Sequence, residues 1–260
     1  MHTSVRLSGV TQVYVTQQGA TLALENIDFT LAPGEFASLV GPSGCGKTTL
    51  LSIVAGLIKP TSGIVEVNGV PVAEPSMQVG YMLQQDYLFP WRSIWDNALI
   101  GLELAGRITA ESKAYTLHLL EEMGLADAVN RYPSQLSGGM RQRVALVRTL
   151  AAEPDILLLD EPFSALDYQT KLQLEDLVAE TLRKHRKTAL LVTHDISEAI
   201  AMSGRVIILD RNPGRVRKEI VIPEDIRQMS PFHAREADGF HRLFHEIWKE
   251  FEFIEQKGEA

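Results

Sequence analysis

The stretch Gly41-Pro-Ser-Gly-Cys-Gly-Lys-Thr48 decides the fold, because it fits the pattern G-x-x-x-x-G-K-[ST]. Its glycines let the backbone wrap closely, with N–H groups pointing inward as an anion-binding nest. The helix that begins near Lys47 adds the positive end of its dipole. In this pattern the Lys47 side chain bridges the β- and γ-phosphates of a nucleotide, and the Thr48 hydroxyl ligates Mg²⁺. The alternative is a glycine-rich turn that holds lysine and threonine by chance.

The sequence on either side of this loop disfavours the chance reading. A short apolar strand at 36–40 precedes the loop and a helical run at 47–57 follows it, which is how a nucleotide-binding α/β unit begins. Further along, continuous apolar runs of strand length alternate with helical stretches at 167–184 and 195–203. These runs are 155–160, 188–193 and 205–210, with a possible edge strand at 216–222. Such a pattern predicts a parallel sheet that is covered on both faces.

Three other regions differ from this core. Residues 3–31 alternate between apolar and polar, which predicts half-buried antiparallel strands. Residues 92–153 contain helical patterns at 93–104, 110–124 and 144–152, and therefore look like an all-helical insertion. The tail places apolar residues on one side of a helix, which covers the core or contacts a second copy: Phe240, Leu243, Phe244, Ile247, Trp248 and Phe251.

Composition excludes several classes of protein. The chain has 260 residues, 45% hydrophobic and 22% charged, which disfavours disorder and a coiled-coil rod. A net charge of -8 disfavours a non-specific nucleic-acid binder. The single cysteine excludes a disulfide within the chain and fits a reducing cytoplasm. No signal peptide is evident, and no apolar run approaches the ~18 residues that a membrane-spanning helix needs.

Two adjacent acids, Asp160 and Glu161, end one of the apolar strands. Ligands of open α/β sheets bind at the carboxyl ends of the strands. Asp160 there can hold the shell of Mg²⁺, and Glu161 can act on a water in line with the γ-phosphate, as a general base or as a positioning group. The alternative is that both acids only cap the following turn.

The run Leu136-Ser-Gly-Gly-Met140 lies between these two sites and resembles the LSGGQ signature of ATP-binding cassette (ABC) ATPases, with Met140 at the glutamine position. The chain resembles the ATPase subunit of an ABC transporter over nearly all of residues 1–210. This resemblance implies one domain with a P-loop NTPase fold: a RecA-like, mainly parallel α/β core, an antiparallel β subdomain and an inserted α-helical subdomain. The core with its β subdomain would span 1–91 and 154–222, the helical subdomain 92–153 and the tail 223–260.

The resemblance also implies roles for single residues. Glu161, His194, Gln84 and Lys47 would be catalytic, with His194 as the switch histidine that contacts the γ-phosphate. Gln84 is favoured over Gln85 by its spacing to Pro90, and would join Thr48 and Asp160 around Mg²⁺. Tyr14 would stack on adenine, although a strand tyrosine is more commonly a packing residue. The ATP-binding set would be Tyr14, Gly41, Pro42, Ser43, Gly44, Cys45, Gly46, Lys47, Thr48 and Thr49.

A second set of residues would serve the ATP of a partner chain. In the family the signature closes over the γ-phosphate of the other cassette, so one chain holds an incomplete site. The resemblance assigns this contact to Ser137, Gly138, Gly139 and Met140, and to Asp167 of the D-loop Ser164-Ala-Leu-Asp167. Ser137 could instead be a plain helix cap. A homodimer, or a pair with a second ABC ATPase, is therefore expected.

The segment Leu88-Phe-Pro-Trp-Arg-Ser93 resembles importers of nitrate, taurine, aliphatic sulfonates and thiamine precursors, as do Asn212-Pro-Gly-Arg-Val216 and the aromatic tail. The resemblance implies a peripheral protein on the cytoplasmic face of the inner membrane. It would energise uptake through a separate permease. A periplasmic or extracellular solute-binding protein would deliver the solute to that permease. Residues 85–100 and the helical subdomain would form the groove for the permease, and the apolar residues 89–91 are either buried core or this docking surface.

Two other functions compete with the importer. A soluble ABC ATPase acting on DNA or ribosomes would carry long coiled-coil insertions or a second cassette, and no nucleic-acid partner is expected here. Another P-loop class, such as a nucleotide kinase or a GTPase, is disfavoured by the signature at 136–140 and by His194. No guanine-reading N-K-x-D run follows the core, so ATP is the expected nucleotide.

Cys45 lies inside the glycine-rich loop. The nest and the nearby Lys47 should favour its thiolate, and alkylation should block ATP binding. The alternative is a small residue that is tolerated for packing, and we prefer this for its normal role.

Overall fold

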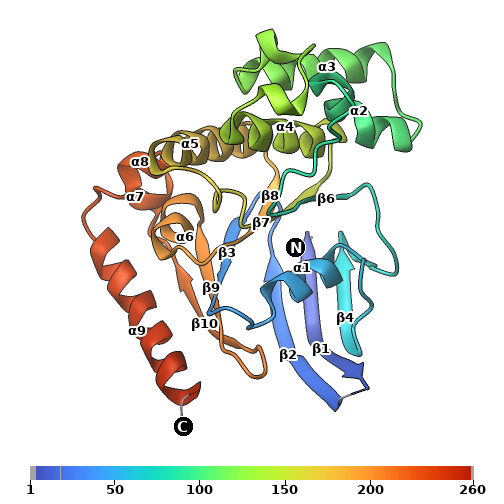
Figure 1. Ribbon diagram of the computed structural model, residues 1–260. Helices are drawn as coiled ribbons and strands as arrows, with labels where there is room; N and C mark the ends of the chain where they lie inside the picture. The colour runs from blue at the N-terminus through green and yellow to red at the C-terminus, as the bar shows by residue number, and fades with distance from the viewer. Residues whose placement is uncertain (1–3, 18, 259–260) are drawn as a thin grey trace.

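The computed structural model describes residues 4–17 and 19–258, and its larger sheet has six strands in the order β10-β9-β3-β8-β7-β6 (Figure 1). These strands are β3 Phe36–Val40, β6 Val79–Met82, β7 Ile156–Asp160, β8 Thr188–Val192, β9 Arg205–Leu209 and β10 Val216–Val221. Neighbours run parallel except β10, which pairs antiparallel with β9 at the edge. The predicted mainly parallel α/β core is confirmed.

The apolar strands are buried because different elements cover the two faces of this sheet. Leu157 and Leu159 of β7 belong to a cluster with the helices of the middle segment. Ile156 and Leu158 belong to a second cluster that includes α1 (Lys47–Val54) and the smaller sheet. Successive strand side chains point to opposite faces, so both faces of β7 require apolar residues.

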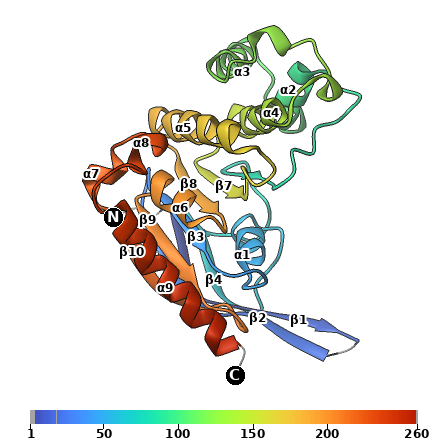
Figure 2. The same cartoon turned by 60° about the vertical axis from the view of Figure 1, so that its left-hand side comes forward.

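The smaller sheet is antiparallel, as the alternating N-terminal pattern predicts. Its four strands have the order β2-β1-β4-β5: β1 Val5–Thr16, β2 Gly19–Leu31, β4 Ser62–Val67 and β5 Val70–Pro71. The two longest of these strands form the hairpin that extends at the lower edge of Figure 2.

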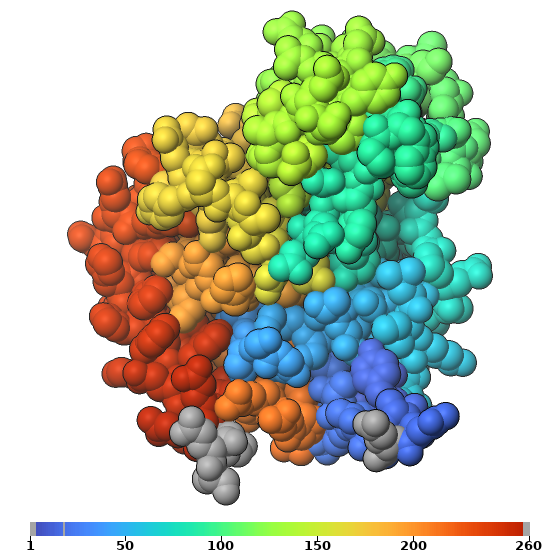
Figure 3. All heavy atoms as spheres, viewed as in Figure 1, coloured from blue at the N-terminus to red at the C-terminus, as the bar shows by residue number. Residues whose placement is uncertain are grey.

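The middle segment is helical, and in Figures 1 and 3 it stands above the sheets. It contains α2 Ile94–Leu104, α3 Ala110–Glu122, two short 3₁₀ helices (Ala126–Ala128 and Pro133–Gln135) and α4 Gly138–Ala151. The last helix begins before the predicted range 144–152, directly after Ser137, where the sequence allowed a helix cap. The Ser137 hydroxyl accepts a hydrogen bond from the N–H of Met140 at 3.3 Å and begins the helix six residues earlier.

The sequence did not predict β6, which is short and contains Gly80. A side chain at Gly80 would have its Cβ 2.6 Å from the Thr149 side chain, because α4 crosses this edge strand closely. β6 pairs in parallel with β7, from Val79 opposite Ile156 to Met82 opposite Leu159. This pairing places the residues after Met82 beside the residues after Asp160.

The C-terminal part returns to the core. After α5 (Tyr168–Lys184) and α6 (Ile196–Met202) come α7 Glu224–Arg227, α8 Pro231–Ala234 and α9 Phe240–Gly258. The tail helix α9 lies along β10 and α6 in both views and buries Phe240, Leu243, Ile247 and Ile254 in one cluster with them (Figures 1 and 2). The tail helix therefore covers the core. Within the described residues, no helix is long and apolar enough to span a membrane.

Candidate functional site

The glycine-rich loop joins β3 to α1 at the carboxyl edge of the larger sheet. Gly46 precedes α1 with a φ of 97°, a left-handed conformation that glycine adopts without strain. The Lys47 ammonium group donates to the carbonyl oxygens of Gly41 at 2.7 Å and Pro42 at 3.1 Å, and the side chain is buried. The loop therefore holds a cation against its own backbone, beside the free N–H groups at the start of α1.

A second loop, between β9 and β10, packs against the glycine-rich loop, and this contact was not predicted from the sequence. Gly214, between β9 and β10, donates its N–H to the carbonyl of Ala23 and accepts from the N–H of Glu25, both at 2.9 Å. A Cβ atom at Gly214 would lie 2.2 Å from the carbonyl oxygen of Cys45, and one at Gly41 would lie 2.7 Å from the Cys45 sulfur. The loop backbone is therefore packed without space for a methyl group.

Cys45 is fully buried within this packing. Burial raises the pKa of its thiol, and the charge and hydrogen bonds of Lys47 only partly oppose this effect. The predicted preference for the thiolate is therefore wrong, because desolvation outweighs the neighbouring cation. The sulfur is a packing atom of the loop.

Asp160 ends β7 and faces the glycine-rich loop. Its carboxylate accepts hydrogen bonds from the Thr48 hydroxyl at 3.5 Å and from the Tyr81 hydroxyl at 3.3 Å. Burial raises the pKa of Asp160, while these two hydrogen bonds lower it. Tyr81 was missed from sequence because it lies on the unpredicted strand β6. Two of the predicted Mg²⁺ ligands, Thr48 and Asp160, thus lie in contact.

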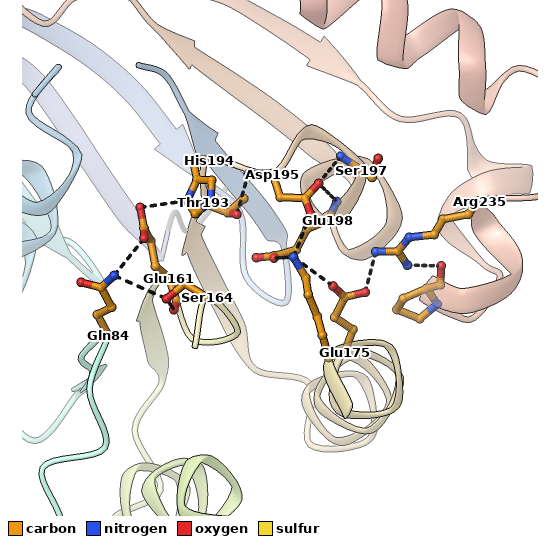
Figure 4. Close-up of polar contacts among 12 residues, drawn as sticks. Gln84, Glu161, Ser164, Glu175, Thr193, His194, Asp195, Ser197, Glu198 and Arg235 are labelled. Carbon is orange, nitrogen blue, oxygen red and sulfur yellow. Dashed lines mark hydrogen bonds and ion pairs between the residues drawn. The ribbon is translucent and has the colours of Figure 1, made fainter. Parts of the chain in front are cut away.

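Glu161 follows directly and receives side chains from two other strands. Gln84 donates from Nε2 to Glu161 Oε2 at 3.1 Å, and His194 Nδ1 lies 3.3 Å from Glu161 Oε1 (Figure 4). Gln84 and His194 follow β6 and β8, the two neighbours of β7, so three adjacent strands end at this point. Glu161 itself has a φ of 46°, which is uncommon for a residue with a side chain. The structure thus brings together three of the four predicted catalytic residues.

Tyr14 lies on β1 beside the glycine-rich loop. Its hydroxyl donates to the Thr49 hydroxyl at 3.3 Å, and the residue is 37% exposed. The ring therefore offers an aromatic surface next to the start of α1. The remaining predicted loop residues lie between β3 and α1: Pro42, Ser43 and Gly44.

The predicted partner-facing residues form a separate group. Gly139 packs against the first turn of α5, where its Cβ would lie 2.5 Å from the Thr170 side chain. Asp167 caps that turn by accepting from the N–H of Thr170 at 3.0 Å, and this hydrogen bond lowers the pKa of Asp167. Ser137 and Gly138 complete the start of α4 alongside. In the part of the chain that the structure describes, no hydrogen bond or ion pair joins Ser137–Met140 to the glycine-rich loop.

The exposure of Trp91 distinguishes between the two alternatives for residues 89–91, which were buried core and exposed surface. Its side chain is 71% exposed, and it borders a hollow of about 500 Å³ on the helical segment. Phe89 is only partly buried and packs against Trp91, with ring centroids 5.3 Å apart. Trp91 is therefore a surface residue and is not part of the core.

Comparison with known proteins agrees with this geometry. A family model described as ABC transporter matches residues 24–164. The ABC transporter ATP-binding protein YtlC of Bacillus subtilis (strain 168) is 53% identical over 248 residues, which are 95% of each chain. The aliphatic sulfonates import ATP-binding protein SsuB of the same organism is 38% identical over 97% of this chain and 96% of its own.

A solved structure is also similar: the dimeric post-hydrolysis state of the ATP-binding cassette MJ0796 bound to ADP and Pi. It is 33% identical to this chain and has a TM-score of 0.74. The match covers 84% of this chain and 99% of that structure's chain.

A glycine-rich loop facing paired carboxylates, at the edge of a mainly parallel sheet, defines a P-loop NTPase. The chain belongs to the ABC transporter family, and within it this protein is an ATP-binding ATPase.

Proposed function

We propose that this chain is the ATP-hydrolysing subunit of an importer that takes up a small organic sulfonate through a separate membrane permease. The observation that carries the proposal is the similarity to SsuB, named for the import of aliphatic sulfonates, over nearly the whole of both chains. Among the solutes that the sequence allows, this similarity favours sulfonates, with taurine as one member of that class, over nitrate or a thiamine precursor.

In the proposed reaction, residues 41–49 hold the phosphates of ATP and Tyr14 stacks on the adenine. Lys47 and the N–H groups of the loop neutralise phosphate charge. Glu161 acts on the attacking water, and Gln84 holds the second carboxylate oxygen of Glu161 and so orients it. His194 contacts the γ-phosphate. The 3.1 and 3.3 Å contacts among these three side chains support their joint action.

Mg²⁺ fits the residues that face the loop. Thr48 and Asp160 supply hydroxyl and carboxylate oxygen, the ligands that Mg²⁺ prefers. A cation would also stabilise the charge of Asp160, whose pKa burial raises. Gln84 is the third proposed ligand. When bound, Mg²⁺ would neutralise phosphate charge during hydrolysis. Among the described residues no cluster of three or more His, Cys, Asp or Glu could hold a metal, so phosphate and water oxygens would complete the shell.

Two chains would complete each site. Ser137, Gly138, Gly139, Met140 and Asp167 lie together at the starts of α4 and α5. We propose that these helix starts contact the γ-phosphate held by a partner chain, either a second copy or another ABC ATPase. The dimeric state of the similar cassette supports this arrangement.

The hollow beside Trp91 is the proposed docking site of the permease. It is lined by residues of α2 and its approach, including Trp91, Trp95 and Leu99, with Tyr132 from across the helical segment. An exposed tryptophan at a hollow of this size is typical of an interface anchor. The chain would thus sit at the cytoplasmic face of the membrane without entering it, and the solute-binding protein would contact only the permease.

Uptake in cells that lack this chain tests the proposal. We expect such cells to lose uptake of labelled aliphatic sulfonates and growth on a sulfonate as the only sulfur source. The wild-type chain should restore both, and Glu161→Gln should restore neither. Trp91→Glu should also fail, although the purified variant still hydrolyses ATP. Normal uptake of sulfonates, taurine, nitrate and thiamine precursors without the chain would instead support a soluble ABC ATPase.

A further inference from the structure

Beside the proposed catalytic residues lies a cluster of buried charges from α5, from α6 and its N-cap, and from the end of α8. Lys171 of α5 contacts Asp195 at 2.8 Å and Glu198 at 2.7 Å, and lies 3.8 Å from Glu175 (Figure 4). Arg235, the residue directly after α8, binds the other oxygen of Glu175 at 2.6 Å. The side chains of Glu175 and Glu198 are 0% and 3% exposed, so this is an ionic network inside the protein.

The network reaches the residue next to His194. The His194 side chain is 65% exposed, and the polar contact that the structure describes for it is the 3.3 Å one to Glu161. Its position therefore depends on its own backbone. Thr193 on one side is buried in the sheet and Asp195 on the other carries the network. The Asp195 carboxylate also caps α6, accepting from the N–H groups of Ser197 at 2.8 Å and Glu198 at 3.2 Å.

A hollow of about 230 Å³ connects the two groups of residues. It is lined by Glu161 and His194 on one side and by Lys171, Asp195 and Glu198 on the other. The His194 loop therefore borders open space and is held by the N–H of Thr193 on the carbonyl of Leu39 and by the contacts of Asp195. Removing the cation that holds Asp195 would let this loop move.

We propose that Lys171 is a positioning residue for His194, and that Arg235 of the C-terminal segment maintains it by holding Glu175. This inference rests on the proposed role of His194 in hydrolysis. It gives the C-terminal segment a function at the catalytic edge, because α8 packs against α5 and Arg235 reaches Glu175 there.

Charge balance explains why Arg235 matters to Lys171. The network contains three carboxylates and two cations. Burial opposes the charge on Lys171, but Glu198 and Asp195 together hold its pKa above the ordinary value. Without Arg235, ionised Glu175 would have only Lys171 as a partner. A buried, unpaired carboxylate is costly, so at a pH where Glu175 stays ionised it would compete with Asp195 for the same ammonium group.

The test uses the full chain at a pH above the raised pKa of Glu175, and measures kcat and KM for ATP. For Lys171→Met we expect kcat to fall about ten- to a hundredfold, as for a small misplacement of a catalytic group. KM for ATP should stay within about twofold, because the phosphate loop is unchanged. Lys171→Arg keeps the charge and should retain most of the activity. Arg235→Met should lower kcat less, and adding Glu175→Gln should restore it by removing the competing charge.

The control is Lys249→Met, which removes an exposed lysine of α9 and should change neither constant. Melting temperature and the fraction of chains that bind ATP are measured for each variant, so that rates refer to folded protein. A Lys171→Met variant with a lower melting temperature but wild-type kcat per ATP-binding chain would mean a purely structural network and overturn the proposal. So would a double variant no better than Arg235→Met.

Two reference variants separate this result from the proposed function. If His194→Ala and Glu161→Gln hydrolyse ATP normally, the proposed catalytic roles fail, and this inference fails with them. If both variants lose hydrolysis but Lys171→Met does not, the catalytic roles stand and only the positioning role is overturned.

Discussion

The glycine-rich loop and the His194 loop follow neighbouring strands, β3 and β8, yet they are held in different ways. The first is fixed through its backbone, with Gly41 and Gly214 packed against Cys45 so closely that a methyl group does not fit. The second carries an exposed side chain and is restrained through a buried ionic network. The difference indicates that the glycine-rich loop is preorganised, whereas the His194 loop, which we propose to act on the γ-phosphate, can adjust.

The largest expected effect comes from changing Glu161, whose carboxylate contacts His194. Glu161→Gln keeps the size of the residue but removes the proposed base, so hydrolysis should fall by about 10²–10⁴-fold. ATP binding should persist, because the loop at 41–48 is unchanged. Gel filtration with ATP should then show a stable two-chain complex. A Glu161→Gln variant that turns over at the wild-type rate would sink the assignment.

The stability of the folded chain should depend on pH because of the ionic network. Burial raises the pKa of Glu175 to about 7, although Arg235 opposes the shift. Because the folded chain binds this proton more tightly than the unfolded chain, stability is lost as the pH rises from about 4.5 to about 7. At about 1.4 kcal/mol for each unit, the loss is about 3 kcal/mol.

Glu175→Gln removes this titration. In urea unfolding the variant should be more stable than the wild type above pH 7, and the difference should shrink toward pH 5. Two parallel stability curves over that range would contradict the buried charge. ATP binding by the phosphate loop should show no such pH dependence. It therefore serves as the internal comparison.

The glycine-rich loop, which is fixed through its backbone, should be displaced when one methyl group is added beside it. In Gly214→Ala the new Cβ would lie 2.2 Å from the Cys45 carbonyl oxygen, so the loop must shift. We expect a loss of about 1–3 kcal/mol of stability, as in other overpacked sites. ATP affinity should fall about tenfold, which corresponds to about 1.4 kcal/mol. Titration with a fluorescent ATP analogue measures this, and unchanged affinity would show that the loop is not held by this packing.

The smallest effect, of opposite sign, is expected from a matched glycine elsewhere. Gly101 lies inside α2, and its Cβ would meet the Ala152 side chain at 3.7 Å, an ordinary contact. Gly101→Ala should therefore stabilise the chain by about 0.5–1 kcal/mol without changing ATP affinity. A loss of ATP affinity here would mean that glycine packing at the loop is not special.

The sequence predicted those parts of the site that depend on contiguous residues. The loop at 41–48 and the acids Asp160 and Glu161 each follow an apolar strand, and their pattern is local. Tyr81 could not be found, because β6 is four residues long and becomes a strand only by pairing with β7. Gly214 and Lys171 were also missed, since their importance comes from contacts with distant segments. The thiolate prediction for Cys45 failed because burial is a property of the fold.

Cys45 has one more consequence. It is the only cysteine in the chain, it is fully buried, and its sulfur lies in the wall of the phosphate loop. A thiol reagent can reach it only when that loop opens, so the labelling rate of the native protein reports the fraction of time that the loop is open, or the opening rate where labelling outpaces reclosing. Cys45 is therefore a native probe for the motion of the ATP site, and no engineered cysteine is needed.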